Sequence, residues 1–239
     1  MRVPSPRRLL TTLRWPFGVL LTGWSYMWRT TPMHRRELQG VWDEDAPPPL
    51  PDSIDRDGVQ TPDAGAGPLL HRRYRARIRD PRLDPSAVIA TVAEDPNRVA
   101  PGSLARFQKT RGEQGRMAVG DEWVVRMPGP WDGPVRVVDV GPEHFRFATL
   151  DGHLEAGQIE WRAFADDGAL GFVIDSWARS GDRLSDVLHN RLRMAKEVQL
   201  HMWTSVLERV AKLAGGRLAA GVDIETRRVE PGALGGDSR

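Results

Sequence analysis

The stretch 182–214 contains neither glycine nor proline, and Gly215 and Gly216 follow it directly. Apolar residues recur within it at steps of three and four positions, namely Leu184, Leu188, Leu192, Ala195, Val198, Met202, Val206, Val210 and Leu213. This spacing predicts a long amphipathic helix that ends at a glycine cap. Such a helix needs a large apolar surface to pack against, which constrains the rest of the fold.

Short segments with alternating apolar side chains precede this helix and predict the surface that it covers. They span 71–79, 104–110, 121–127, 135–140, 145–150, 158–164 and 170–178. Asp84 and Pro85 predict the start of one short helix over 84–93, because aspartate caps helices and proline suits their first position. The sequence Asp-Asp-Gly at 166–168 predicts a hairpin turn. Strands that follow one another this closely predict a single curved antiparallel sheet.

Together these elements predict an α+β fold of the helix-grip kind, in which a curved antiparallel sheet wraps on a long C-terminal helix. Such an arrangement favours an apolar cavity between sheet and helix, which could hold a small apolar molecule or a lipid. Six large apolar side chains are the candidate ligand-binding residues of its wall: Trp123, Phe145, Phe147, Trp161, Phe172 and Met202. Ordinary core packing is the alternative role for each of them.

Charge and proline content divide the chain into four parts. Residues 1–40 carry seven arginines and one glutamate, a net charge of +6, and are expected to form a basic amphipathic extension. Residues 41–68 carry seven acids and one arginine, a net charge of −6, together with six prolines, which predicts an extended acidic linker. The helix-grip domain is expected over 69–214. A glycine-rich tail, 215–239, follows and adds at most one short strand near Val222.

The basic extension contains a second amphipathic pattern. One helical face collects the large apolar residues Leu10, Leu13, Phe17, Leu20, Leu21, Trp24 and Trp28. The uncharged run 15–28 would span roughly 21 Å as a helix, less than the ~30 Å hydrocarbon core of a bilayer. The pattern therefore indicates either a helix on an anionic membrane surface or a helix packed against the main domain or a partner subunit. The expected location is cytoplasmic, and in the first case peripheral at the inner face of the membrane.

The segment 120–160 resembles a known family. Its residues in order are Thr149, Leu150, Gly152, His153 and Gly157, followed by an acid at Glu160. With Ser176, Arg179 and Gln199 as looser matches, they resemble the family catalogued as domain of unknown function 1990 over 69–214. The resemblance implies the START-like, birch-allergen-like superfamily, which includes lipid carriers, polyketide cyclases and binding domains. Membership of that superfamily does not imply one function.

His153, Glu155 and Glu160 lie within eight residues and are the candidate catalytic residues. A neutral imidazole beside a carboxylate can act as a general base at neutral pH. The alternative is that His153 shapes a turn and hydrogen-bonds to the backbone. A metal site is the weakest alternative, because zinc needs at least three protein ligands and no other histidine has a matching spacing.

Several function classes are excluded or disfavoured. The chain has no cysteine, which excludes disulfides and thiol chemistry. It contains no glycine-rich phosphate loop, dinucleotide fingerprint or serine nucleophile elbow, so no cofactor is expected. Its basic residues are almost all arginine, a general bias that predicts no nucleic-acid partner. Three functions remain: binding of a small apolar molecule or lipid, which the sequence favours over catalysis; a cyclase- or hydrolase-type reaction through His153 with Glu155 or Glu160; and attachment to a membrane surface through the N-terminal helix.

Overall fold

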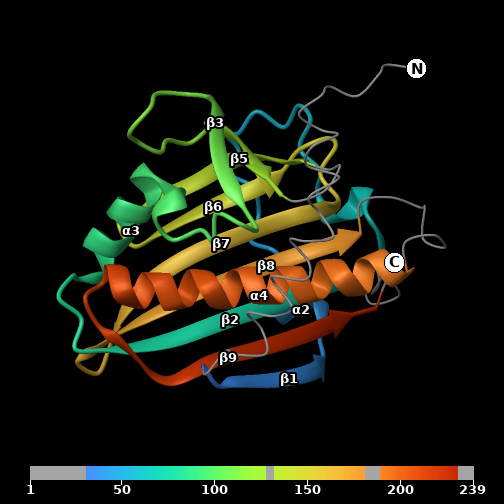
Figure 1. The fold of residues 1–239 in the computed structure, drawn as a ribbon. Helices are drawn as coiled ribbons and strands as arrows, with labels where there is room; N and C mark the ends of the chain where they lie inside the picture. The colour runs from blue at the N-terminus through green and yellow to red at the C-terminus, as the bar shows by residue number, and fades with distance from the viewer. Residues whose placement is uncertain (1–30, 128–131, 181–188, 231–239) are drawn as a thin grey trace.

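The computed structural model describes residues 31–127, 132–180 and 189–230, with the side chains of the long helix described from Gln199 onward. Within these ranges the strands are β1 (Met33–Gln39), β2 (Ala66–Arg79), β3 (Arg106–Arg111), β4 (Glu122–Arg126), β5 (Asp132–Gly141), β6 (His144–Thr149), β7 (Glu155–Asp166), β8 (Ala169–Ser180) and β9 (Arg217–Val229). They form one sheet in the order β1-β9-β2-β8-β7-β6-β5-β4-β3, on which helix α4 (His189–Leu213) packs (Figure 1). Neighbouring strands are antiparallel except β1 and β9, which are parallel. The predicted α+β helix-grip fold is therefore confirmed.

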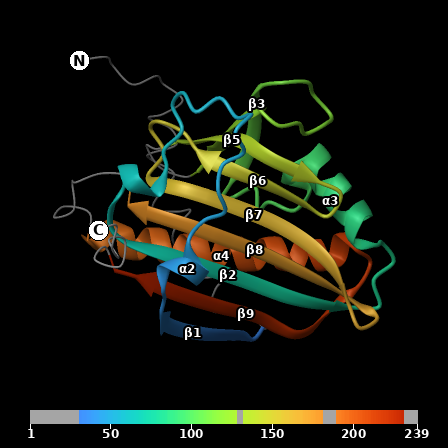
Figure 2. The ribbon, with the colours of Figure 1, turned by 180° about the vertical axis from the view of Figure 1, so that it is seen from behind.

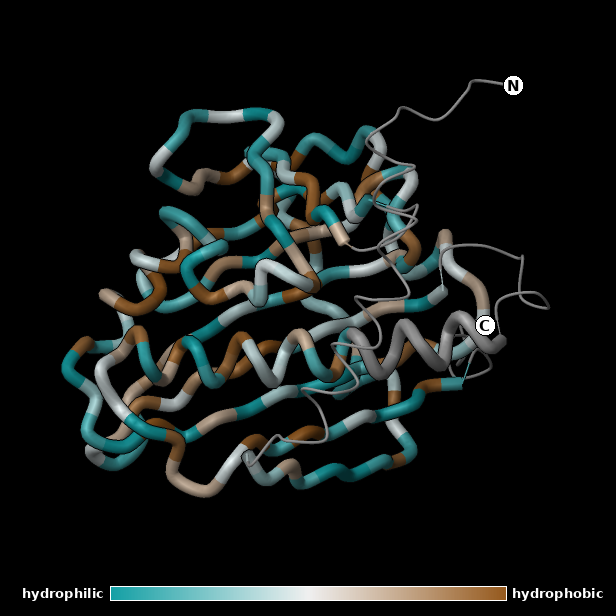
Figure 3. Tube along the Cα trace, in the orientation of Figure 1, coloured by the Kyte–Doolittle hydropathy of each residue, from teal (hydrophilic) through white to brown (hydrophobic). Residues whose placement is uncertain are grey.

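The sheet face that packs against α4 is called the inner face here, and the opposite one the outer face. Along β2, Tyr74, Ala76 and Ile78 are buried on the inner face, and the arginines between them are exposed on the outer face. This alternation of hydrophobic and hydrophilic residues, visible along the strands in Figure 3, is the predicted one. The predicted hairpin turn between β7 and β8 is also present, because Asp167 and Gly168 adopt the positive φ angles (46° and 76°) that a type I′ turn requires.

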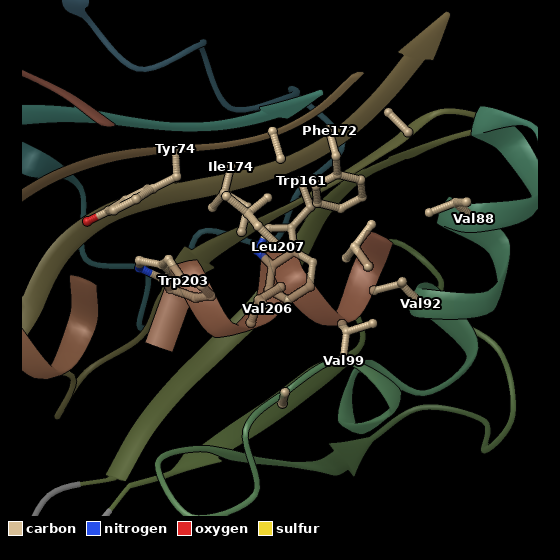
Figure 4. Close-up of a cluster of buried hydrophobic side chains, with 14 of the residues drawn as sticks. Tyr74, Val88, Val92, Val99, Trp161, Phe172, Ile174, Trp203, Val206 and Leu207 are labelled. Carbon is tan, nitrogen blue, oxygen red and sulfur yellow. The ribbon is translucent and has the colours of Figure 1, made fainter. Parts of the chain in front are cut away.

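The apolar core lies between the inner face, α4 and α3 (Pro85–Glu94). Trp161 of β7 is fully buried at its centre, with its ring centroid 5.3 Å from that of Phe145 and 5.7 Å from that of Trp203 on α4 (Figure 4). Helix α3 closes one end of this core (Figure 4). Asp84 caps α3 as predicted, since its carboxylate accepts a hydrogen bond of 2.8 Å from the backbone N–H of Ala87.

Residues 41–65 cross the outer face of the sheet as a strap, which Figure 2 shows running past β8, β7 and β6. The strap begins with the short helix α2 (Trp42–Asp45) and ends with the single turn η1 (Pro62–Ala64). Side chains on the outer face donate hydrogen bonds to its backbone carbonyls: Gln158 to Pro48, Arg146 to Pro49, and Arg136 to Asp55 and Asp57. The acidic segment expected over 41–68 as an extended linker is therefore hydrogen-bonded to the outer face of the sheet over residues 41–65. Its prolines lack N–H donors, and the sheet supplies the donors that the strap carbonyls need.

At the start of the strap, Asp45 joins a buried charged network on the outer face. The ring of His71 lies between two carboxylates, with Nδ1 2.8 Å from Asp45 Oδ1 and Nε2 3.1 Å from Asp175 Oδ1. Arg73 Nε donates to Asp175 at 2.8 Å, and the His71 ring stacks on Trp177. The side chains of Asp45 and Asp175 are only 1% and 3% exposed. Burial favours the neutral acid, but hydrogen bonds from His71 and Arg73 outweigh it and lower the pKa of Asp175.

The sheet extends beyond the boundaries expected for the domain. Strand β1 falls in the expected N-terminal extension, and β9 occupies most of a tail for which the sequence predicts one short strand. The two are ordered by pairing, because β9 pairs with β2 along one edge and with β1 along the other. The amphipathic helix predicted within residues 1–30 lies outside the described residues. None of the helices in the described ranges combines the length and the apolar composition that a membrane crossing needs.

Candidate functional site

The inner face of the sheet changes from apolar to polar along β7 and β8. Trp161 and Ile174 face one another in the core, and the next inner pair toward the start of α4 is Ile159 and Ser176. Glu155, the first residue of β7, lies two pairs further along on the same face. The space between the inner face and α4 is called the grip below. On the strands β7 and β8, this end of the grip is lined by small and polar residues instead of aromatic rings.

Arg72, Glu155 and Gln199 form a polar cluster at this end. Arg72 Nη1 donates to Gln199 Oε1 at 2.9 Å and to Glu155 Oε1 at 3.3 Å, and Gln199 Nε2 donates to Glu155 Oε2 at 3.1 Å. The side chain of Arg72 is 9% exposed and that of Glu155 is 28% exposed, so solvent reaches the cluster from one side. The cluster joins β2 and β7 to α4. A buried ion pair contributes little net stability compared with apolar packing, so stability alone is a weak reason for its presence.

Two further donors lie between the polar cluster and the core. Tyr74 is two residues from Arg72 on the inner face, and its ring centroid is 6.5 Å from that of Trp203. Burial raises the pKa of Tyr74 to about 12, with Arg72 opposing the shift and Glu155 adding to it, so the hydroxyl stays protonated. The indole Nε1 of Trp203 is buried and has no hydrogen-bond partner among the described residues. Figure 4 shows the Tyr74 hydroxyl and the Trp203 nitrogen on the same side of the core.

The side chains predicted to line a cavity form the packed core, which is the alternative role considered for them. None is more than 6% exposed: Trp123, Phe145, Phe147, Trp161, Phe172 and Met202. Four of the aromatic rings contact one another or Phe107. Two surface hollows of about 550 and 630 Å³ lie elsewhere in the described structure, one beside Lys109 and the other beside Arg209. Of the six side chains, only Trp123 borders either hollow.

His153 follows Gly152, whose φ of +91° suits glycine, in the turn between β6 and β7. Its Nδ1 lies 2.9 Å from the carbonyl oxygen of Glu155 and 3.0 Å from the backbone nitrogen of the same residue. This is the backbone contact considered as the alternative to catalysis. Burial lowers the pKa of His153, although Glu155 opposes the shift, so the imidazole is neutral at neutral pH. The Glu155 carboxylate itself bonds to the polar cluster instead of the ring.

Glu160 lies on the outer face, away from His153. It is five residues beyond Glu155 on the same strand, so the two side chains point to opposite faces. Glu160 lies opposite Asp175 of the neighbouring strand β8. The Arg162 Nε atom lies 3.7 Å from the Glu160 carboxylate. The structure therefore brings the backbone of Glu155, but not its carboxylate, into contact with the His153 ring, and it places Glu160 on the other face. No group of three metal-ligating side chains is found among the described residues.

The alternation along β2 carries a signal for Arg72, although Arg72 is not among the candidate residues predicted from the sequence. Arg72 has the same parity as Tyr74 and so points inward, whereas the arginines at 73, 75, 77 and 79 point outward. On α4, Gln199 lies four residues before Trp203, so both fall on one side of the helix. The contact of Arg72 and Gln199 with Glu155 could not be predicted from neighbouring residues, because Arg72 and Glu155 are 83 positions apart.

No family model matches the chain and no curated protein matches it, so the resemblance to domain of unknown function 1990 rests on the quoted residues alone. Similar solved structures include KanY (TM-score 0.46, 12% identity, 64% of this chain and 99% of that one) and the major latex-like protein 151 of Panax ginseng (0.45, 12%, 61% and 97%). The di-domain ARO/CYC StfQ of the steffimycin biosynthetic pathway is a third (0.45, 12%, 62% and 51%). At such low identities and TM-scores, no function is carried over from these proteins.

Proposed function

We propose that this protein binds a small, largely apolar molecule in the grip, at the end where the inner face of the sheet meets the start of α4. The observation that carries the proposal is the polar cluster on the inner face. A helix that only needs to pack would cover apolar side chains along its whole length, as α4 does over the core. Arg72, Glu155 and Gln199 instead offer polar groups that would orient a bound molecule.

The apolar part of the molecule would lie against Trp203, Ile159 and the small inner-face residues Ser176 and Ala178. Ile159 packs against the core but is itself only partly buried. The packed rings around Trp161 close the site on the side of α3. The proposed site therefore occupies one end of the grip and not the aromatic wall predicted from the sequence.

Binding of N-phenylnaphthylamine, an uncharged dye whose fluorescence rises in apolar surroundings, tests this proposal. We expect saturable binding of one dye per chain. Ser176→Phe should weaken it at least about tenfold, because the added ring fills the inner face next to Ile159.

Arg75→Phe, on the outer face of the neighbouring strand, is the matched control and should bind the dye as the unmodified protein does. Unchanged binding by Ser176→Phe, with circular dichroism showing an intact fold, would place the site elsewhere. Absence of saturable binding to the unmodified protein would refute the proposal.

Acid–base catalysis by His153 is a second candidate function, and one observation favours it. Burial lowers the pKa of His153 and keeps the ring in the neutral form that can accept a proton, and Glu155 lies two residues away. If His153 is catalytic, the molecule that co-purifies should differ in mass between the two proteins. Mass spectrometry should find the reaction product with the unmodified protein and the unreacted substrate with His153→Gln. Equal conversion by both proteins would exclude this role.

Attachment to an anionic membrane surface through residues 1–40 remains a prediction from the sequence. Residues 1–30 lie outside the described structure, and Arg35 and Arg36 belong to strand β1. Flotation of the full chain with vesicles of anionic and of zwitterionic lipid tests it, and equal flotation with both would contradict it.

A further inference from the structure

The polar end of the grip holds a buried donor without an acceptor. The indole of Trp203 is buried, and its N–H has no partner in the part of the chain that the structure describes. Buried polar groups are nearly always paired in native proteins, so an unpaired one calls for an explanation. An acceptor atom supplied by a bound molecule is one such explanation, and Trp203 borders the proposed site.

Tyr74 and Arg72 add donors at the same place. The Tyr74 ring lies next to that of Trp203, and burial raises the pKa of its hydroxyl to about 12, so the hydroxyl keeps its proton and can donate it. Arg72 uses Nη1 for Gln199 and Glu155, which leaves the N–H groups on Nε and Nη2 outside those contacts. The acceptor oxygens of Glu155 and Gln199 are already engaged within the polar cluster. The groups left over are therefore donors.

These donors fit an oxyanion better than any other polar group. A guanidinium recognises a carboxylate or sulfonate through two parallel N–H groups, and bonds to a charged acceptor are the strong ones. Glu155 would repel an anion, but Arg72 and Gln199 already bind both of its oxygens. A cationic group would be repelled by the Arg72 guanidinium and would face the Trp203 N–H, with the neutral Tyr74 hydroxyl as its acceptor in place of an anionic one.

We propose, on the basis of the binding function above, that the molecule held in the grip is an organic anion, with a carboxylate or sulfonate on an apolar body, and that Trp203, Tyr74 and Arg72 hold its oxyanion. The apolar body lies against the inner face and α4. The oxyanion lies toward Glu155, where the cluster is open to solvent.

Two dyes that differ only in a sulfonate test this assignment. Anilinonaphthalene sulfonate should bind about tenfold more tightly than N-phenylnaphthylamine to the unmodified full chain, because the sulfonate gains charge-assisted hydrogen bonds. Trp203→Phe and Tyr74→Phe each remove one donor and keep a ring, and each should remove most of that tenfold preference. Binding of the uncharged dye should change little in either variant.

Trp177→Phe is the matched control, because Trp177 also has a buried, unpaired indole N–H but lies on the outer face. It should keep the preference for the sulfonate. If both dyes bind equally to the unmodified protein, or if the preference survives in Trp203→Phe and Tyr74→Phe, the oxyanion assignment is wrong and the binding proposal stands. If neither dye binds, the proposed function itself fails.

Discussion

Replacing Asp175 by alanine is expected to lower the free energy of unfolding by about 3 kcal/mol, because its buried carboxylate accepts hydrogen bonds from His71 and Arg73, and hydrogen bonds to a charged group contribute about 1.5–3 kcal/mol each. The variant removes the carboxylate that faces both His71 and Arg73. His71 would keep its bond to Asp45 while its ring stays buried against Trp177. The two strands and the strap that meet at this network would lose their common partner. Urea unfolding at neutral pH measures the change.

Asp166→Ala is the matched control for this prediction. Asp166 pairs with Arg75 and Arg77 at 3.2 and 3.3 Å on the same outer face, but these arginines are 46% and 44% exposed. Exposed ion pairs contribute only about 0–1 kcal/mol, so the control should be close to the unmodified protein. A loss for Asp175→Ala no larger than that for Asp166→Ala would show that the buried network does not stabilise the fold.

The same network makes the stability depend on pH in the acid range. His71, Arg73 and Arg162 face the Asp175 carboxylate, and its pKa is lower in the folded than in the unfolded chain. Its contribution is therefore complete above about pH 4, the ordinary pKa of aspartate, and is lost as the pH falls through the folded-state value. The difference in the free energy of unfolding between the unmodified protein and Asp175→Ala should shrink below about pH 4. A difference that stays constant there would contradict this cause.

Trp161→Ala should lower the free energy of unfolding by about 3–5 kcal/mol, as the truncation of large aromatic side chains in packed cores does. The indole is fully buried, and rings of Phe145, Phe172 and Trp203 surround it at centroid distances of 5.3, 6.4 and 5.7 Å. These rings come from β6, β8 and α4, so the resulting cavity could not close without moving several elements. Thermal or urea unfolding measures the loss.

Phe164→Ala serves as the control for Trp161→Ala because it lies on the same strand but on the outer face. Its ring is only partly buried, and the Arg75 guanidinium lies 5.6 Å from the ring centroid. Truncating it should cost no more than about 1.5 kcal/mol. Equal losses for the two variants would mean that the core around Trp161 is not tightly packed.

Features that depend on neighbouring residues could be predicted from the sequence. The inward side chains of β2 follow from a period of two, and the cap of α3 depends on Asp84 and the residues directly after it. The turn between β7 and β8 depends on Asp167 and Gly168, which can both adopt positive φ. The steps of three and four along α4 likewise predict a helix that packs on the sheet.

Features that depend on distant partners could not be predicted in this way. The composition of the strap describes a solvated chain, but Arg136 and Arg146 on the sheet provide its carbonyls with donors, and His71 provides Asp45 with a partner. The pairing of β1 with β9 joins segments from opposite ends of the chain. The polar cluster joins Arg72 to Gln199 across 127 positions. Candidate site residues chosen for their proximity in the sequence therefore included Glu160, which points to the other face.

The binding of an organic anion beside Trp203 can be followed at the atom concerned. The indole N–H signals in a proton–nitrogen NMR spectrum report on each tryptophan, and Trp→Phe variants assign them. On addition of anilinonaphthalene sulfonate, the Trp203 signal should move downfield because its N–H gains an acceptor, while that of Trp177 on the outer face should stay in place. A Trp203 signal that does not move while the dye binds would contradict the account.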